Sequence, residues 1–223
     1  MPVAPRALKI AVPGGEEVSA LWLSPPSARA CLVLAHGAGA GMAHRSMAAV
    51  ADGLAERRVA TLRYQFLYME RGSKRPDPPA LAHGVVRAAV AEAGRRAEQL
   101  ALFAGGRSFG GRMTSQAQAK EPLPKVGGLV FFAFPLHPAG KPSDERAAHL
   151  ADVQIPMLFL SGSNDALASL DLLQPVIGGL GQRATLKLID GADHSFHVPA
   201  RSGRKDSDVL SDVLDEAAAW MTR

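Results

Sequence analysis

Short apolar runs recur along the 223 residues of this chain, and helix-like stretches separate most of them. The pattern predicts strands at 8–12, 18–23, 30–35, 59–63, 100–104, 126–132, 157–160 and 184–188. It predicts helices at 47–58, 79–100, 108–120, 167–178 and 206–221. Two strands open the chain, and strand and helix then alternate. This order predicts an α/β fold with a mostly parallel sheet and an antiparallel edge at the N-terminus.

Several of these runs, such as 32–34 and 157–160, are apolar at every position. Continuous apolar runs are typical of strands that helices cover on both faces of a sheet. The length suits one domain with a sizeable core, and no proline-rich or glycine-rich linker divides the chain. We therefore expect residues 1–223 to form a single domain.

Composition excludes several classes of function. The net charge is +4, but the arginines are spread along the chain and few aromatic residues accompany them, so no nucleic-acid site is expected. No segment reaches the roughly 18 consecutive apolar residues of a membrane span, and residues 1–10 lack the apolar core of a signal peptide. We expect a cytoplasmic protein with no membrane association. Cys31, the only cysteine, can form no internal disulfide and is expected to be buried.

One pentapeptide carries the strongest chemical signal. Residues 106–110 read Gly-Arg-Ser-Phe-Gly, with an apolar run before them and a helix-compatible stretch after them. A serine on such a sharp strand-to-helix turn has its hydroxyl exposed at the edge of the sheet. The small residues two before and two after the serine let strand and helix approach the turn. Ser108 is therefore the candidate nucleophile.

A serine nucleophile needs a histidine to accept its proton and an acid to orient that histidine. Asp165 follows the predicted strand at 157–160, and His194 follows the last predicted strand. Ser108, Asp165 and His194 thus occur in the order Ser, Asp, His, each after a different strand. Asp165 is also placed to cap the helix at 167–178, a role that is compatible with catalysis.

Other residues compete for these roles. Asp171 falls inside a predicted helix, whereas Asp190 and Asp193 lie close to the histidine in sequence. His197 is an alternative to His194, but it directly precedes Val-Pro, a setting more typical of a wall or surface position.

A tetrahedral intermediate also needs N–H donors for its oxyanion. One expected donor is the backbone N–H of Phe109, directly after the nucleophile. The other is expected in the glycine-rich loop after the third strand, at Ala38, with Gly37 or Gly39 as alternatives. His36, which begins this loop, is expected to brace the turn.

Cofactor motifs are absent from the sequence. The glycines at 37–41 lack the last glycine of a dinucleotide fingerprint, because Met42 stands there. The glycines at 105–110 lack the Lys-Ser/Thr of a phosphate-binding loop. The seven histidines show no metal-ligand spacing. We therefore expect no cofactor and no metal.

Longer motifs surround these candidate residues. They are Leu34–Met42, Arg63–Glu70, Arg75–Asp77, Gly105–Met113 and Pro135–Pro138. In these motifs the chain resembles the α/β-hydrolase superfamily, and within it the small dienelactone-hydrolase-like proteins. The branch it resembles includes related domains in a testis-expressed eukaryotic protein and in a subunit of a histone-acetylation complex. The resemblance implies the α/β-hydrolase fold and the same catalytic triad.

The predicted pocket is open and shallow. The connection at 135–146 is short, which predicts that no large lid domain covers the site. The expected substrate-binding walls are formed by Met42, Phe66, Tyr68 and His137, with His44 and Leu136 as further wall candidates. Arg45 and Arg107 are placed to favour an acidic substrate, although Arg107 is equally placed to pair with a nearby carboxylate.

The sequence therefore predicts a serine hydrolase that cleaves a small or medium carboxylic ester or thioester through an acyl-enzyme. The expected partner is a small-molecule ester. Dienelactone itself is not the expected substrate, since dienelactone hydrolases proper carry a cysteine nucleophile. Two alternatives remain at this stage, namely a catalytically weak interaction module with the same fold and another acyl-transfer or haloperoxidase-like reaction at the same site.

Overall fold

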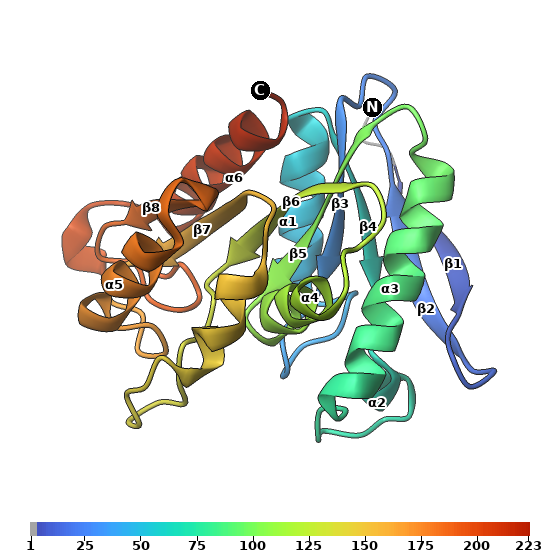
Figure 1. Cartoon of the computed structure of the whole chain (residues 1–223). Coiled ribbons are helices and arrows are strands. Elements are labelled where there is room, and N and C mark those ends of the chain that lie inside the picture. Colours follow the sequence, from blue (N-terminus) through green and yellow to red (C-terminus); the bar gives the residue numbers. More distant parts are fainter. Residues whose placement is uncertain (1–3) are drawn as a thin grey trace.

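An eight-stranded sheet forms the centre of the computed structural model, which describes residues 4–223 (Figure 1). The strands are β1 (Arg6–Ala11), β2 (Glu17–Leu23), β3 (Ala30–Ala35), β4 (Val59–Tyr64), β5 (Ala101–Arg107), β6 (Val126–Phe132), β7 (Met157–Gly162) and β8 (Ala184–Ile189). Their order in the sheet is β1-β2-β4-β3-β5-β6-β7-β8. β2 pairs antiparallel with both β1 and β4. The remaining neighbours in the sheet, β4-β3-β5-β6-β7-β8, all pair parallel. The predicted fold class is confirmed.

Helices cover both faces of the sheet (Figure 1). One face packs against α1 (Arg45–Glu56) and α6 (Asp206–Met221). The other packs against α3 (Pro79–Arg96), α4 (Phe109–Lys120) and α5 (Leu170–Leu180). Between these layers β3 is buried at every position, and burial raises the pKa of the Cys31 thiol to about 12. Across residues 4–223, no helix combines the length and the apolar character that crossing a membrane requires.

Several short elements escape the sequence pattern. They are the one-turn helix α2 (Leu67–Glu70) and the 3-10 segments η1 (Glu145–Asp152), η2 (Gly181–Arg183) and η3 (Ala200–Ser202). Such short pieces cannot establish the apolar repeat by which helices are predicted. α2 begins instead through a tertiary contact, because the carboxylate of Asp77 accepts the backbone N–H of Tyr68 at 2.9 Å.

The strand β5 runs beyond its predicted end, through Gly105 and Gly106 to Arg107. Glycine carries no apolar side chain, so the sequence pattern ends early. Pairing with β3 and β6 nevertheless continues to this point. A Cβ at Gly105 would overlap the backbone of Val130 on β6, so only glycine fits. β5 therefore delivers the chain directly to Ser108.

Within residues 4–223, no lid domain covers the carboxyl edge of the sheet. The connection between β6 and β7 contains only the 3-10 segment η1 as regular structure. The loops that follow β3, β5, β7 and β8 are thus left as the surroundings of this edge. The prediction of a lidless domain is confirmed.

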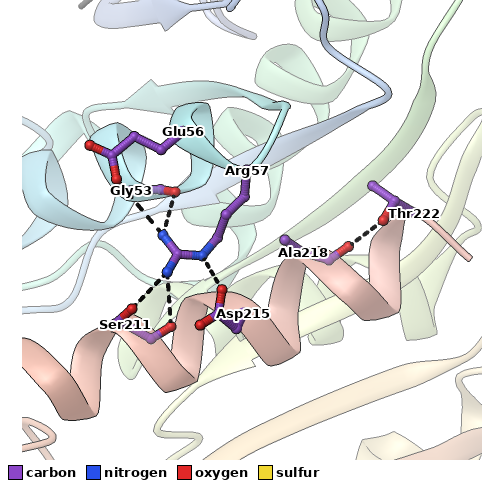
Figure 2. A network of polar contacts seen from close by, with 7 residues as sticks. All are labelled: Gly53, Glu56, Arg57, Ser211, Asp215, Ala218 and Thr222. Atoms are coloured by element: carbon purple, nitrogen blue, oxygen red, sulfur yellow. Dashed lines mark hydrogen bonds and ion pairs between the residues drawn. The ribbon is translucent and has the colours of Figure 1, made fainter.

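A polar network fastens α1 to α6 (Figure 2). Arg57, directly after α1, donates from Nε to Asp215 Oδ1 at 2.7 Å and from Nη2 to Ser211 Oγ at 2.8 Å. Its Nη1 donates to the Gly53 carbonyl at 2.9 Å. The helices lie so close here that a Cβ at Gly53 would collide with the side chain of Leu214. Arg57 thereby links the two helices beside this close contact.

We expect Arg57→Met to lower the free energy of unfolding by about 1–2 kcal/mol, because it removes several hydrogen bonds to a half-buried guanidinium. Urea denaturation of the purified protein measures the change. Arg204→Met is the matched control. Arg204 forms an exposed ion pair with Asp212 of α6, and this pair should contribute less than about 0.5 kcal/mol to the free energy of unfolding. Equal losses in both variants would contradict a specific role for the Arg57 network.

Candidate active site

Ser108 occupies a strained turn between β5 and α4. Its φ is +49°, in the left-handed region that side chains other than glycine rarely adopt. The flanking glycines permit the turn, because a Cβ at Gly106 would lie 2.5 Å from the carbonyl oxygen of Ala35, and a Cβ at Gly110 would lie 2.5 Å from that of His36. The Ser108 N–H is held by a carbonyl of β6 at 3.0 Å. The surrounding backbone thus dictates the position of the hydroxyl.

The structure brings the three predicted triad residues together. His194 Nε2 lies 2.8 Å from Ser108 Oγ, and His194 Nδ1 lies 2.7 Å from Asp165 Oδ2. The second carboxylate oxygen of Asp165 accepts the N–H of Leu167 at 2.8 Å. The Asp165 side chain is fully buried, whereas 22% of the His194 side chain is exposed. With the Nδ1 proton donated to the carboxylate, Nε2 is free to accept the serine proton.

The sheet explains why residues so distant in sequence meet. Ser108, Asp165 and His194 follow β5, β7 and β8, whose carboxyl ends lie at the same edge. The histidine turn is held by Asp193, whose Oδ1 accepts the N–H groups two and four residues further along, at 2.7 Å and 3.0 Å. A Cβ at Gly162, the end of β7, would overlap this turn. Glycine here lets the histidine loop approach the aspartate loop.

The competing residues are used elsewhere. His197 Nδ1 lies 2.8 Å from a carboxylate oxygen of Asp206 at the start of α6. Asp190 accepts the hydroxyl of Ser163 at 3.4 Å, and Asp171 lies in the first turn of α5. Asp193 holds the backbone of its own turn. Among the competing acids and His197, none forms a hydrogen bond with His194 or Ser108 in the described part of the chain.

His36 and Tyr68 hold the loop after β3. The N–H of Phe66 donates to His36 Nε2 at 3.1 Å, so the ring proton resides on Nδ1 and is donated to the Gly37 carbonyl at 2.7 Å. Burial lowers the pKa of His36 and keeps this ring neutral. The Tyr68 hydroxyl donates to the Ala38 carbonyl at 2.8 Å, and burial, with a smaller contribution from nearby acid, raises its pKa to about 12. His36 therefore braces the loop as predicted.

These two bonds orient the N–H groups of the loop. In a trans peptide the C=O and N–H point in opposite directions, so fixing the carbonyls of Gly37 and Ala38 also fixes the N–H groups of Ala38 and Gly39. The loop passes beside the nucleophile, since a Cβ at Gly37 would lie 3.9 Å from Ser108 Cβ. Phe109 is the first residue of α4, and its N–H has no acceptor within the helix. The loop that carries Ala38 thus passes close to Ser108, and Phe109 follows Ser108 directly; their role as oxyanion donors stays a prediction.

The predicted wall residues differ in exposure. Met42 is half-buried at the surface of the loop. Phe66 and Tyr68 are buried, and the Phe66 ring meets the Phe109 ring edge-on at 5.3 Å. His137 is only 3% exposed and its Nδ1 donates to the Pro138 carbonyl at 2.9 Å. The side chains of Phe66, Tyr68 and His137 are thus buried in this structure, and their role as substrate-binding walls stays a prediction.

Sequence reasoning missed Arg63 and Gln65. Arg63, on β4, is only 2% exposed and donates to the Met42 carbonyl at 3.1 Å. Gln65 Oε1 accepts the Met42 N–H at 2.9 Å, and a Cβ at Gly41 would lie 2.7 Å from the same oxygen. The available signal was the one charged residue in a parallel strand that is otherwise uncharged. Such a residue needs buried polar partners, and here they are backbone groups of the loop after β3.

The acid and imidazole groups of residues 4–223 form no cluster of three or more that could hold a metal ion.

The family described as Alpha/beta hydrolase domain matches residues 28–222. The chain belongs to this family. Its fold is similar to that of a dienelactone hydrolase from Anabaena variabilis, with a TM-score of 0.78 and 21% identity over 99% of this chain and 97% of that one.

Two further solved structures show the same fold. An α/β serine hydrolase without lid from Xanthomonas campestris is 20% identical, with a TM-score of 0.75, over 100% of this chain and 98% of that one. The esterase domain of a Rhodothermus marinus protein is 16% identical, with a TM-score of 0.73, and 98% of each chain is covered. The family and these esterase-like neighbours support a hydrolase.

We expect Gly110→Ala to destabilise this α/β hydrolase by about 3 kcal/mol, because the added methyl group would press on the backbone of the loop after β3. Thermal and urea denaturation measure the loss. Gly178→Ala, in α5, is the control. Its Cβ meets no atom within 4 Å, so the substitution should leave stability unchanged or raise it by up to about 1 kcal/mol. A harmless Gly110→Ala would show that the turn has room to spare.

Proposed function

We propose that this protein is a serine hydrolase that cleaves small or medium carboxylic esters or thioesters through an acyl-enzyme formed on Ser108. The observation that carries the proposal is the pair of hydrogen bonds that joins Ser108 Oγ to His194 Nε2 at 2.8 Å and His194 Nδ1 to Asp165 at 2.7 Å. This arrangement matches the need of a serine hydroxyl for a base and of that base for an orienting acid.

In the proposed reaction Ser108 Oγ attacks the acyl carbon while His194 Nε2 takes the hydroxyl proton. Buried Asp165 stabilises the resulting imidazolium. The N–H groups of Ala38 and Phe109 hold the oxyanion of the tetrahedral intermediate. Collapse of this intermediate breaks the ester bond, and His194 returns the proton to the leaving alcohol or thiol. Water, deprotonated by His194, then attacks the acyl-enzyme and releases the acid and free Ser108.

The remaining features agree with this chemistry. The reaction needs no cofactor or metal. The absence of a lid leaves the edge of the sheet accessible to an ester of small or medium size. Serine at the elbow argues against dienelactone as the substrate. The proposed partner is therefore a small-molecule ester, with no nucleic acid or membrane involved, and a cytoplasmic location remains the prediction from sequence.

The alternative of an interaction module without useful catalysis has less support. A scaffold has no need of a serine on a strained backbone whose hydroxyl binds an imidazole that a buried carboxylate orients. The resemblance to domains of the testis-expressed protein and of the histone-acetylation subunit stays a prediction from sequence.

Ser108→Ala should remove nearly all ester hydrolysis, by a factor on the order of 10⁴ to 10⁶ in kcat, because no other group replaces the nucleophile. Release of 4-nitrophenol from 4-nitrophenyl butanoate measures turnover. Intact mass after treatment with a fluorophosphonate should show one adduct on the wild type and none on the variant. Hydrolysis that survives in Ser108→Ala, or no adduct on well-folded wild type, would overturn the proposal.

Tyr68→Phe should lower kcat about tenfold with little change in KM, because it frees the Ala38 carbonyl and so loosens the loop that carries the proposed oxyanion donor at Ala38, which acts mainly in the transition state. The same 4-nitrophenyl assay measures both constants. Tyr64→Phe is the matched control, since it removes the other tyrosine hydroxyl from the fully buried side chain of β4. Equal kinetic effects of the two substitutions would exclude a positioning role for Tyr68.

A further inference from the structure

A second feature beside the triad is a pocket between α1 and α6. It contains about 570 Å³ of space free of protein atoms, part of it open to solvent. Its walls come from both helices, from the carboxyl ends of β3 and β6 and from the histidine loop. The lining residues are Leu34, Ser46, Met47, Val50, Arg107, Phe132, Ser195, Phe196, Asp206 and Leu210.

The lining includes the residues that directly flank two of the proposed catalytic residues in the chain. Arg107 is the residue before Ser108, and Ser195 is the residue after His194. Most of the remaining walls are aliphatic or aromatic. An apolar recess next to a nucleophile suits the hydrocarbon part of an acyl group, because burying each methylene contributes about 0.8 kcal/mol.

Arg107 is the one cationic side chain among these lining residues. It is half-buried, and burial lowers the pKa of its guanidinium, with nearby Asp193 acting in the opposite direction. Within residues 4–223, the ion pairs that arginines form with carboxylates all involve arginines other than Arg107. Its N–H donors thus have no direct carboxylate partner in the described part of the chain.

The nearby carboxylates are engaged by other groups. Asp193 Oδ1 accepts two backbone N–H groups of the histidine turn, at 2.7 Å and 3.0 Å. Asp206 binds His197 Nδ1 at 2.8 Å and accepts the Val198 N–H at 3.1 Å. A half-buried guanidinium without an ion-pair partner favours an anion from outside, and its planar fork matches a carboxylate in two parallel hydrogen bonds.

We propose that this pocket receives the acyl part of the substrate and that Arg107 recognises a carboxylate on that acyl part. The inference rests on the proposed function and specifies its substrate class as half-esters or half-thioesters of dicarboxylic acids. Hydrolysis then adds water across the ester bond at Ser108 and releases an alcohol or thiol, a dicarboxylate and a proton. Arg107 is a specificity residue and takes no part in the bond changes.

Two esters with the same leaving group and a five-carbon acyl chain test the inference. They are 4-nitrophenyl pentanoate and mono-4-nitrophenyl glutarate. The wild type should prefer the glutarate at least tenfold in kcat/KM. Arg107→Gln should abolish the preference, because kcat/KM falls more for the glutarate than for the pentanoate, and Arg107→Lys should retain part of it. Arg6→Gln, which removes an exposed charge on β1, should leave the preference unchanged.

The outcomes separate this inference from the proposed function. Hydrolysis of both esters without preference, or a preference that survives in Arg107→Gln, retains the serine hydrolase and overturns the role of Arg107. Hydrolysis of neither ester overturns the proposed function, and binding then decides the inference. By calorimetry, glutarate should bind Ser108→Ala at least tenfold more tightly than pentanoate, and the added substitution Arg107→Gln should abolish that difference. Equal binding would overturn the anion site.

Discussion

The close packing of backbone against backbone at the end of β5 is the constraint on which the site depends. Gly106 and Gly110 lie so near the carbonyls of Ala35 and His36 that no side chain fits at either position. This contact forces the turn at Ser108 into the left-handed region and also joins the nucleophile to the loop after β3. This contact therefore links the position of the serine to that of the loop that carries a proposed oxyanion donor.

The loop after β3 is held by residues that follow β4, its neighbour in the sheet. Gln65 binds the N–H of Met42, Phe66 fixes the tautomer of His36, and Tyr68 holds the carbonyl of Ala38. The bonds of Gln65 and Tyr68 end on backbone atoms of the loop, and that of Phe66 ends on the imidazole of His36, which in turn binds the Gly37 carbonyl. A glycine-rich segment that would otherwise have many conformations is thereby held in one, which is the preorganisation that oxyanion stabilisation requires.

The two faces of the sheet contribute differently to the candidate site. On the face of α3 and α4, a cluster of aromatic rings that includes Phe66 and Phe109 supports the site. On the other face, α1 and α6 leave a recess that is lined in part by the residue before the nucleophile, and the network around Arg57 links these two helices (Figure 2). The packing of these two helices thus determines the volume that is offered to the acyl part of a substrate.

The order of the longer strands and helices, the elbow at Ser108 and the triad candidates Asp165 and His194 were predictable from sequence, because they follow from local periodicity and from residues placed directly after strands. Arg63, Gln65 and the pocket at Arg107 were decided by tertiary structure alone. Arg63 and Gln65 act on residues more than 20 positions away, and the pocket exists only where α1 and α6 meet. Local patterns report which face a residue takes, but they do not report which distant backbone group it will meet.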